Sequence, residues 1–77
     1  MKIQILGTGC AKCNQFSAAT QAAADRLGLD YEIEKVTDFM RFAEFGVMLT
    51  PALVVDGKLK VAGRVPSDAE IEKMLQS

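Results

Sequence analysis

The sequence predicts one α/β domain over residues 1–77, with the element order βαβαββα and a mixed four-stranded sheet flanked by three helices. A strand–helix–strand opening favours a right-handed crossover between two parallel strands. Asp56-Gly57 separates two runs rich in β-branched residues, which is a strong signal for an antiparallel hairpin. Ser67 and Glu70 have the spacing of a capping box, so the last element is predicted to be a helix.

The first half of the chain is predicted to contain a strand, a long helix and a second strand. Residues 2–6 form a short apolar run that stops at the glycines of residues 7–9. Apolar side chains then recur at helical spacing over residues 11–27, and Gly28 is a helix stop signal. Residues 30–36 alternate between apolar and polar side chains, which indicates a half-buried strand.

The second half is predicted to contain a helix, the hairpin and a final helix. Thr37 or Asp38 can cap the second helix, and Gly46 ends it. We expect Phe45 to be partly exposed on this helix. The residues expected on its inner face are Phe39, Phe42 and Ala43. The hairpin strands are residues 52–55 and 58–62, and the final helix is lined by Ile71, Met74 and Leu75.

Length and composition limit the classes of protein that the chain can represent. Its 77 residues, with 49% hydrophobic and 25% charged side chains, fit one soluble folded domain. The net charge of −1 gives no basic surface for nucleic acid or for an anionic membrane. Its apolar stretches fall far short of the roughly 20 residues that span a bilayer, and the N-terminal run is too short for a signal peptide. We therefore expect a cytoplasmic protein that binds neither nucleic acid nor membrane.

Cys10 and Cys13 are the only cysteines, and histidine is absent. The loop between them is too short for a disulfide that staples the fold. The pair instead lies where the first strand ends and the long helix begins. Outward-pointing N–H groups, the helix dipole and the neighbouring Lys12 all favour a thiolate at this position. The placement therefore indicates reactive thiol chemistry.

Helical spacing predicts different roles for the two thiols. Cys13 shares the inward stripe of the helix with Phe16 and Thr20, whereas Cys10 lies at its exposed tip. An exposed thiolate can attack a disulfide in a partner, and a shielded thiol one turn away can resolve the mixed disulfide. We therefore assign Cys10 as the nucleophile and Cys13 as the resolving cysteine.

Thr50-Pro51 is the second informative pair. Pro51 precedes the apolar strand of residues 52–55, at a place that can bring it beside the cysteines. A trans bond is the usual state before proline. A cis bond would turn the backbone N–H and C=O of Thr50 outward, toward an extended partner peptide or glutathione.

These features together resemble the thioredoxin fold, especially its shortest, glutaredoxin-like members. The resemblance rests on residues 9–13 (Gly-Cys-Ala-Lys-Cys), Thr50-Pro51, the Asp56-Gly57 turn and Gly63, and the element order extends it to essentially the whole chain. It implies thiol–disulfide exchange with Cys10 attacking, Cys13 resolving and Pro51 in cis. The chain differs from thioredoxins at two places. It has Ala11-Lys12 between the cysteines, and it has Gln4 where thioredoxins bury an aspartate.

The resemblance also implies a substrate groove and a class of partner. The groove residues would be Thr8, Gly9, Ala11, Lys12, Thr50, Pro51 and Gly63. No prosthetic group is expected. The substrate would be a protein disulfide, and a thiol reductase or a low-molecular-weight thiol would reduce the pair again. The chain is expected to act as a monomer.

Two other functions stay open at this point. A closed zinc site needs four ligands, and the chain offers two thiols and no imidazole, so no metal site is expected unless a dimer supplies four thiols. Copper chaperones of similar size carry methionine where this chain has Thr8, and they end in a strand where it has a helix. The third hypothesis is a redox-sensing module whose disulfide switches a partner surface.

Overall fold

A mixed four-stranded sheet in the order β2-β1-β3-β4 forms the centre of the molecule. The computed structural model describes residues 1–7 and 11–76. Its elements are β1 (Lys2–Leu6), α1 (Ala11–Arg26), β2 (Glu32–Val36), α2 (Phe39–Phe42), η1 (Ala43–Phe45), β3 (Ala52–Val55), β4 (Lys58–Ala62) and α3 (Asp68–Gln76). β1 pairs in parallel with β2 and antiparallel with β3, and β3 pairs antiparallel with β4. The α/β class and the element order predicted from the sequence are confirmed.

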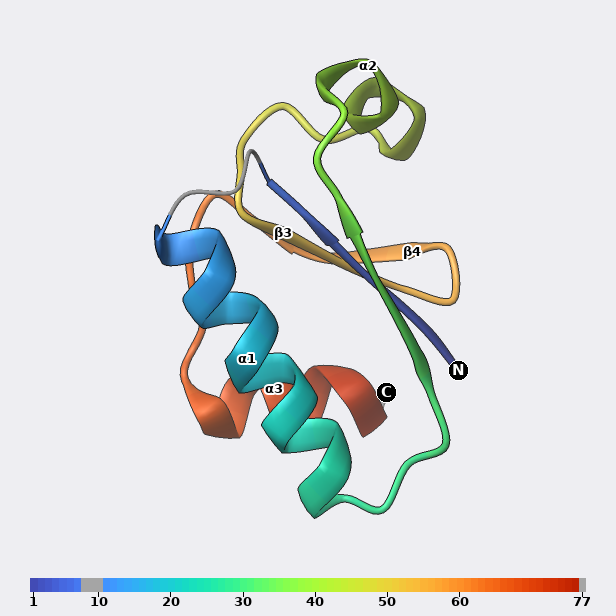
Figure 1. Ribbon diagram of the computed structural model, residues 1–77, viewed down its shortest axis with the longest axis vertical. Coiled ribbons are helices and arrows are strands. Elements are labelled where there is room, and N and C mark those ends of the chain that lie inside the picture. Colours follow the sequence, from blue (N-terminus) through green and yellow to red (C-terminus); the bar gives the residue numbers. More distant parts are fainter. Residues whose placement is uncertain (8–10, 77) are drawn as a thin grey trace.

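Helices cover both faces of this sheet (Figure 1). α1 and α3 lie on one face, where Ile3, Ile5 and Leu53 point toward them. The next side chain along each strand points the other way, so Leu6 and Val54 face α2 and the loop after it. Two small cores therefore share one sheet. No helix among the described residues has the length and apolar character needed to cross a membrane.

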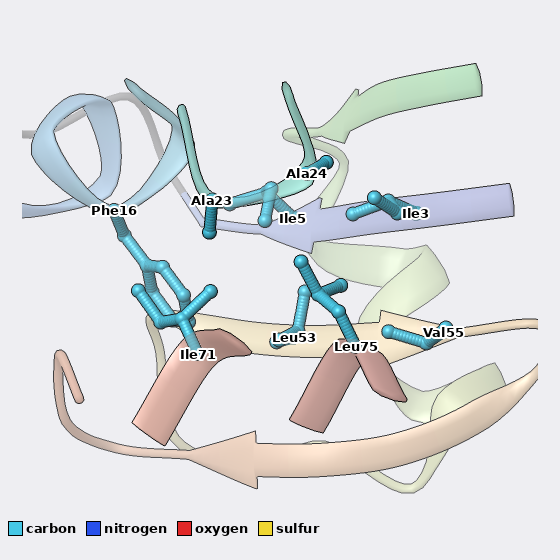
Figure 2. Packing of buried hydrophobic residues seen from close by; sticks show 9 residues of the cluster. All are labelled: Ile3, Ile5, Phe16, Ala23, Ala24, Leu53, Val55, Ile71 and Leu75. Carbon is cyan, nitrogen blue, oxygen red and sulfur yellow. The ribbon is translucent and has the colours of Figure 1, made fainter. Parts of the chain in front are cut away.

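The larger core holds α1 and α3 against the sheet. Figure 2 shows Phe16 reaching from α1 toward Ile71 of α3, with Leu53 and Leu75 packed beside them. Phe16 and Ile71 have no solvent-exposed surface. Because α1 is fixed near its N-terminal end by Phe16, the first turn of the helix has a defined position at the end of the sheet.

The turns and caps follow the sequence signals. Asp56 and Gly57 both have positive φ, at 49° and 81°, as a tight two-residue hairpin turn requires. At the start of α3 the Ser67 N–H donates to Glu70 Oε1 at 3.1 Å, and the Glu70 N–H donates to Ser67 Oγ at 3.2 Å. The predicted capping box is therefore confirmed, and so is the helix that follows it.

The second helix differs from its prediction. Asp38 caps it, accepting a hydrogen bond from the Met40 N–H at 2.9 Å. Phe42 is buried, as expected, but Phe39 and Ala43 are exposed, so their assignment to the core is wrong. The reason is the shortness of α2, which has four residues before the chain tightens into η1. So short a helix places one side chain, Phe42, against the sheet.

Glu70 makes the stability of the fold sensitive to acid. The hydrogen bond from Arg64 Nη2 at 2.9 Å, and then those from Ser67, lower the pKa of Glu70 to about 2 from its ordinary 4.5. The unfolded chain takes up this proton near pH 4.5 and the folded chain only near pH 2. The contribution of Glu70 to stability is therefore present above pH 4.5 and is lost as the pH falls through that interval.

We expect Glu70→Gln to flatten this acid dependence, because glutamine keeps the geometry of the cap but does not titrate. The measurement is the urea unfolding midpoint at several pH values from 7 to 2. Glu72→Gln is the control, since it removes a carboxylate from the same helix but none of the cap. If acid lowered the unfolding midpoint of Glu70→Gln as much as that of the parent protein, the assignment of this acid dependence to Glu70 would be wrong.

Candidate active site

The site is built where β1 ends and α1 begins. Gly7 continues the line of β1, with its N–H donating to the Val36 carbonyl at 3.0 Å. Cys13 lies in the first turn of α1 and is 6% exposed. The prediction that Cys13 points along the buried face of the helix, with Phe16 and Thr20, is therefore confirmed. Cys10, Gly9 and Thr8 lie outside the described residues.

Gly7 is needed because the sulfur of Cys13 packs directly on it. A Cβ atom at Gly7 would collide with Cys13 Sγ and would come within 3.0 Å of Cys13 Cβ. Any side chain at Gly7 would push the thiol out of its place. On its β2 side the thiol borders a cavity of about 20 Å³, which Lys35 and Thr37 also line. The thiol is thus held between the end of the sheet and the helix.

The segment before β3 reaches the same end of the sheet. The Thr50–Pro51 peptide bond is cis. The Gly63 N–H donates to the Pro51 carbonyl at 2.9 Å, which holds the end of β4 beside this turn. Gly63 has a φ of 86°, and a Cβ there would lie 3.2 Å from Leu49 Cβ. Leu49 therefore packs against the backbone of Gly63. Figure 1 shows the segment that leads into β3 passing close to the N-terminal end of α1.

A hollow of about 370 Å³ lies between α1 and this turn. It is lined by Lys12, Gln15, Thr50, Pro51, Gly63, Arg64 and Val65. Four of the residues that the sequence assigned to a substrate groove are thus brought together: Lys12, Thr50, Pro51 and Gly63. Ala11 is the exposed first residue of α1 and does not line the hollow. Lys12, which lines the hollow, directly precedes Cys13 on α1.

Three lining residues were not assigned to the groove from the sequence. Gln15 follows Lys12 by three positions, so helical spacing could have placed it on the same face. Arg64 is exposed and forms an ion pair with Glu70 at 2.9 Å, which orients its guanidinium at the edge of the hollow. Val65 gives no signal in the sequence, since its position depends on the turn after Gly63.

The residue at the position where thioredoxins carry an aspartate forms a link to α2. Gln4 is buried, and its Nε2 donates to Glu34 Oε1 at 2.9 Å. Arg41 of α2 donates to the other oxygen of Glu34 at 3.4 Å. The hydrogen bond from Gln4, followed by that from Arg41, lowers the pKa of Glu34 below its ordinary value. Gln4 thus joins β1 and β2 to α2 through one carboxylate.

Comparison with known proteins identifies the family to which this chain belongs. Residues 1–76 match the model of a thioredoxin domain family. The chain belongs to the thioredoxin family. A protein named thioredoxin from Methanothermobacter thermautotrophicus is 47% identical over 75 residues, which is 97% of each chain. A second thioredoxin, from Methanocaldococcus jannaschii, is 44% identical over 75 residues, covering 97% of this chain and 86% of that relative. This thioredoxin-family chain is a thiol–disulfide oxidoreductase.

The contact between Gly7 and Cys13 can be tested by alkylation. We expect Gly7→Ala to displace the thiol and to raise its rate of alkylation in the folded protein, because a buried cysteine is inert until it becomes accessible. The measurement uses a Cys10→Ser background, so that Cys13 is the reacting thiol. Ala22→Ser is the control, because Ala22 is an exposed residue of α1 nine positions beyond Cys13. Equal rates in the two variants would contradict the proposed packing.

Proposed function

We propose that the chain reduces protein disulfides through Cys10 and Cys13, with Cys10 as nucleophile and Cys13 as resolving thiol. The observation that carries the proposal is the burial of Cys13 in the first turn of α1, packed on Gly7 at the end of β1. A buried thiol reacts poorly with external disulfides. It is suited to attack a mixed disulfide formed by a cysteine one turn earlier.

The two steps would balance as follows. The Cys10 thiolate attacks one sulfur of the partner disulfide, and the partner's S–S bond breaks as the mixed disulfide forms. The released partner sulfur takes up a proton. The Cys13 thiolate then attacks the Cys10 sulfur, the second partner sulfur leaves and is protonated, and Cys10 and Cys13 become a disulfide. Two electrons pass to the partner, and a thiol reductase or a low-molecular-weight thiol returns them.

The hollow beside α1 supplies the place where we propose that the partner lies. Thr50 and Pro51 would face an extended partner segment, with Lys12 on the α1 side and Gly63 on the β4 side. The missing side chain of Gly63 lets Leu49 pack against its backbone. The sequence assigns Thr8, Gly9 and Ala11 to the same groove, but Ala11 does not line this hollow, and Thr8 and Gly9 lie outside the described residues. Lys12 would add a positive charge next to the reacting thiols.

Single cysteine variants test the assignment of roles. We expect Cys10→Ser to reduce insulin reduction by dithiothreitol to the uncatalysed rate, because no thiolate starts the exchange. Cys13→Ser should still attack, but it should accumulate a mixed disulfide with its substrate, which non-reducing electrophoresis and mass spectrometry detect. A Cys10→Ser protein with undiminished turnover would overturn the proposal.

Alkylation of the reduced parent protein near neutral pH gives an independent check. Cys10 should be modified first, because it is assigned to the exposed tip and Cys13 is buried. Peptide mapping after a short exposure to iodoacetamide would show which thiol reacts. Preferential labelling of Cys13 would reverse the two roles.

Stoichiometric binding of Cu(I) or Zn(II) to the reduced protein, without turnover, would favour a soft-metal carrier instead.

A further inference from the structure

Cys13 has to lose its proton before it can resolve a mixed disulfide. The thiolate, and not the thiol, is the nucleophile in thiol–disulfide exchange. Cys13 is buried in the first turn of α1, and burial disfavours the charged form of a thiol. The resolving step is therefore helped by any positive charge that lies close to the Cys13 sulfur.

Gln4 lies on the wrong face of the sheet to assist this thiol. Its amide does not titrate, and its Nε2 donates to Glu34 Oε1 at 2.9 Å. Glu34 also accepts from Arg41 of α2, so these side chains are gathered on the face that α2 covers. Cys13 belongs to α1, which covers the opposite face (Figure 1). The position at which thioredoxins carry an aspartate therefore gives this chain no group beside Cys13.

β2 instead brings a lysine to the face that α1 covers. Lys35 lies opposite Ile5 in the parallel ladder between β1 and β2. Residues paired in this way point to the same face of a sheet, and Ile5 packs in the core with Phe16 of α1. Because β2 is an edge strand, Lys35 is exposed and its ammonium group stays hydrated. Lys35 thus carries its charge on the same face as Cys13.

Lys35 and Cys13 line the same cavity of about 20 Å³. This volume is enough for one water molecule, and Asn14 and Thr37 line the cavity with an amide and a hydroxyl group. Among the described residues around this cavity, Lys35 is the one with a charged side chain. Lys12, which precedes Cys13 in α1, lines the larger hollow beside the helix instead. A positive charge therefore lies across a water-sized space from the buried thiol.

We propose that Lys35 is a charge partner of Cys13, stabilising the Cys13 thiolate across this cavity during the resolving step. The inference rests on the proposed function and adds to it a positioning residue from β2. Opposite charges at close range favour the ionised form of both groups. Lys35 keeps its own proton throughout, so it acts through its electric field and not as a base.

The resolving step balances with Lys35 unchanged. The proton of Cys13 passes to a water molecule in the cavity and from there to solvent. The Cys13 thiolate attacks the Cys10 sulfur, the bond between these two sulfurs forms, and the mixed-disulfide bond breaks. The partner sulfur leaves with the bonding electron pair and is protonated. Removing the charge of Lys35 should therefore change how readily Cys13 ionises, without changing the sulfur atoms that react.

The test measures the resolving step with an excess of the aromatic disulfide dithionitrobenzoate. Cys10 releases one thionitrobenzoate in a phase whose rate rises with reagent concentration. Cys13 then displaces the second thionitrobenzoate in an intramolecular phase whose rate does not depend on that concentration. The pH dependence of this second phase reports how the resolving thiol ionises.

We expect Lys35→Met to move the ionisation of Cys13 higher by about one pH unit. About 10-fold less thiolate is then present at low pH, but the more basic thiolate is about 3-fold more nucleophilic. The second phase should therefore be about 3-fold slower than in the parent protein at low pH, and about 3-fold faster at high pH. The two pH profiles cross, which a loss of packing alone does not produce.

Two further variants separate charge from shape. Lys35→Arg keeps the positive charge and should follow the profile of the parent protein. Lys58→Met is the matched control, because Lys58 is an exposed lysine of β4 that does not line this cavity. It should leave the second phase unchanged at every pH.

Superimposable profiles for Lys35→Met and the parent protein would overturn the inference, and so would equal slowing at every pH. Lys35→Arg behaving like Lys35→Met would also overturn it, since the effect would then not depend on charge. In each of these cases a second phase that Cys13→Ser abolishes would still support the proposed function. A parent protein without the second phase would instead remove the proposed roles of the two thiols.

Discussion

The close contact between Gly7 and Cys13 is the constraint on which the arrangement of the site depends. β1 can end directly beneath the first turn of α1 only because position 7 has no side chain. The same contact buries the Cys13 thiol at the junction between strand and helix. Phe16, one turn further along α1, fixes the helix on the sheet through contacts with Ile71 and Leu53. The end of the sheet that holds the Cys13 thiol is thus positioned by ordinary core packing a few residues away.

Segments distant in the sequence then converge on this end. The turn at Pro51 arrives from α2, and Gly63 arrives from the hairpin and is held by its hydrogen bond to the Pro51 carbonyl. Arg64 follows and is oriented by Glu70, which also caps α3. The hollow beside α1 therefore has one wall from a helix and the other from two turns. On the far side of Leu49 lie the exposed apolar side chains of Met48, Met40 and Phe39.

Much of this could be predicted from local sequence signals. The hairpin needed only Asp56-Gly57, the last helix only its capping box, and the burial of Cys13 only its helical spacing from Phe16. The prediction that Phe39 is buried is wrong because helical periodicity requires several turns, whereas α2 has four residues. Met48 and Leu49 lie outside any helix or strand, so no helical or strand periodicity predicts their exposure. The joining of Lys12 to Arg64 and Val65 in one hollow depends on the packing of distant elements, which spacing does not reveal.

The sheet order has a consequence for folding during synthesis on the ribosome. β1 is an inner strand that pairs with β2 on one side and with β3 on the other, so that Leu6 lies opposite Ala52. A nascent chain that has reached only β2 leaves one edge of β1 without its hydrogen-bonding neighbour, and such edges invite association with other chains. The junction that carries the cysteines therefore acquires its second wall late, when nearly the whole polypeptide has emerged. Contacts between such distant parts of a chain also slow folding, because a long loop must close before they form.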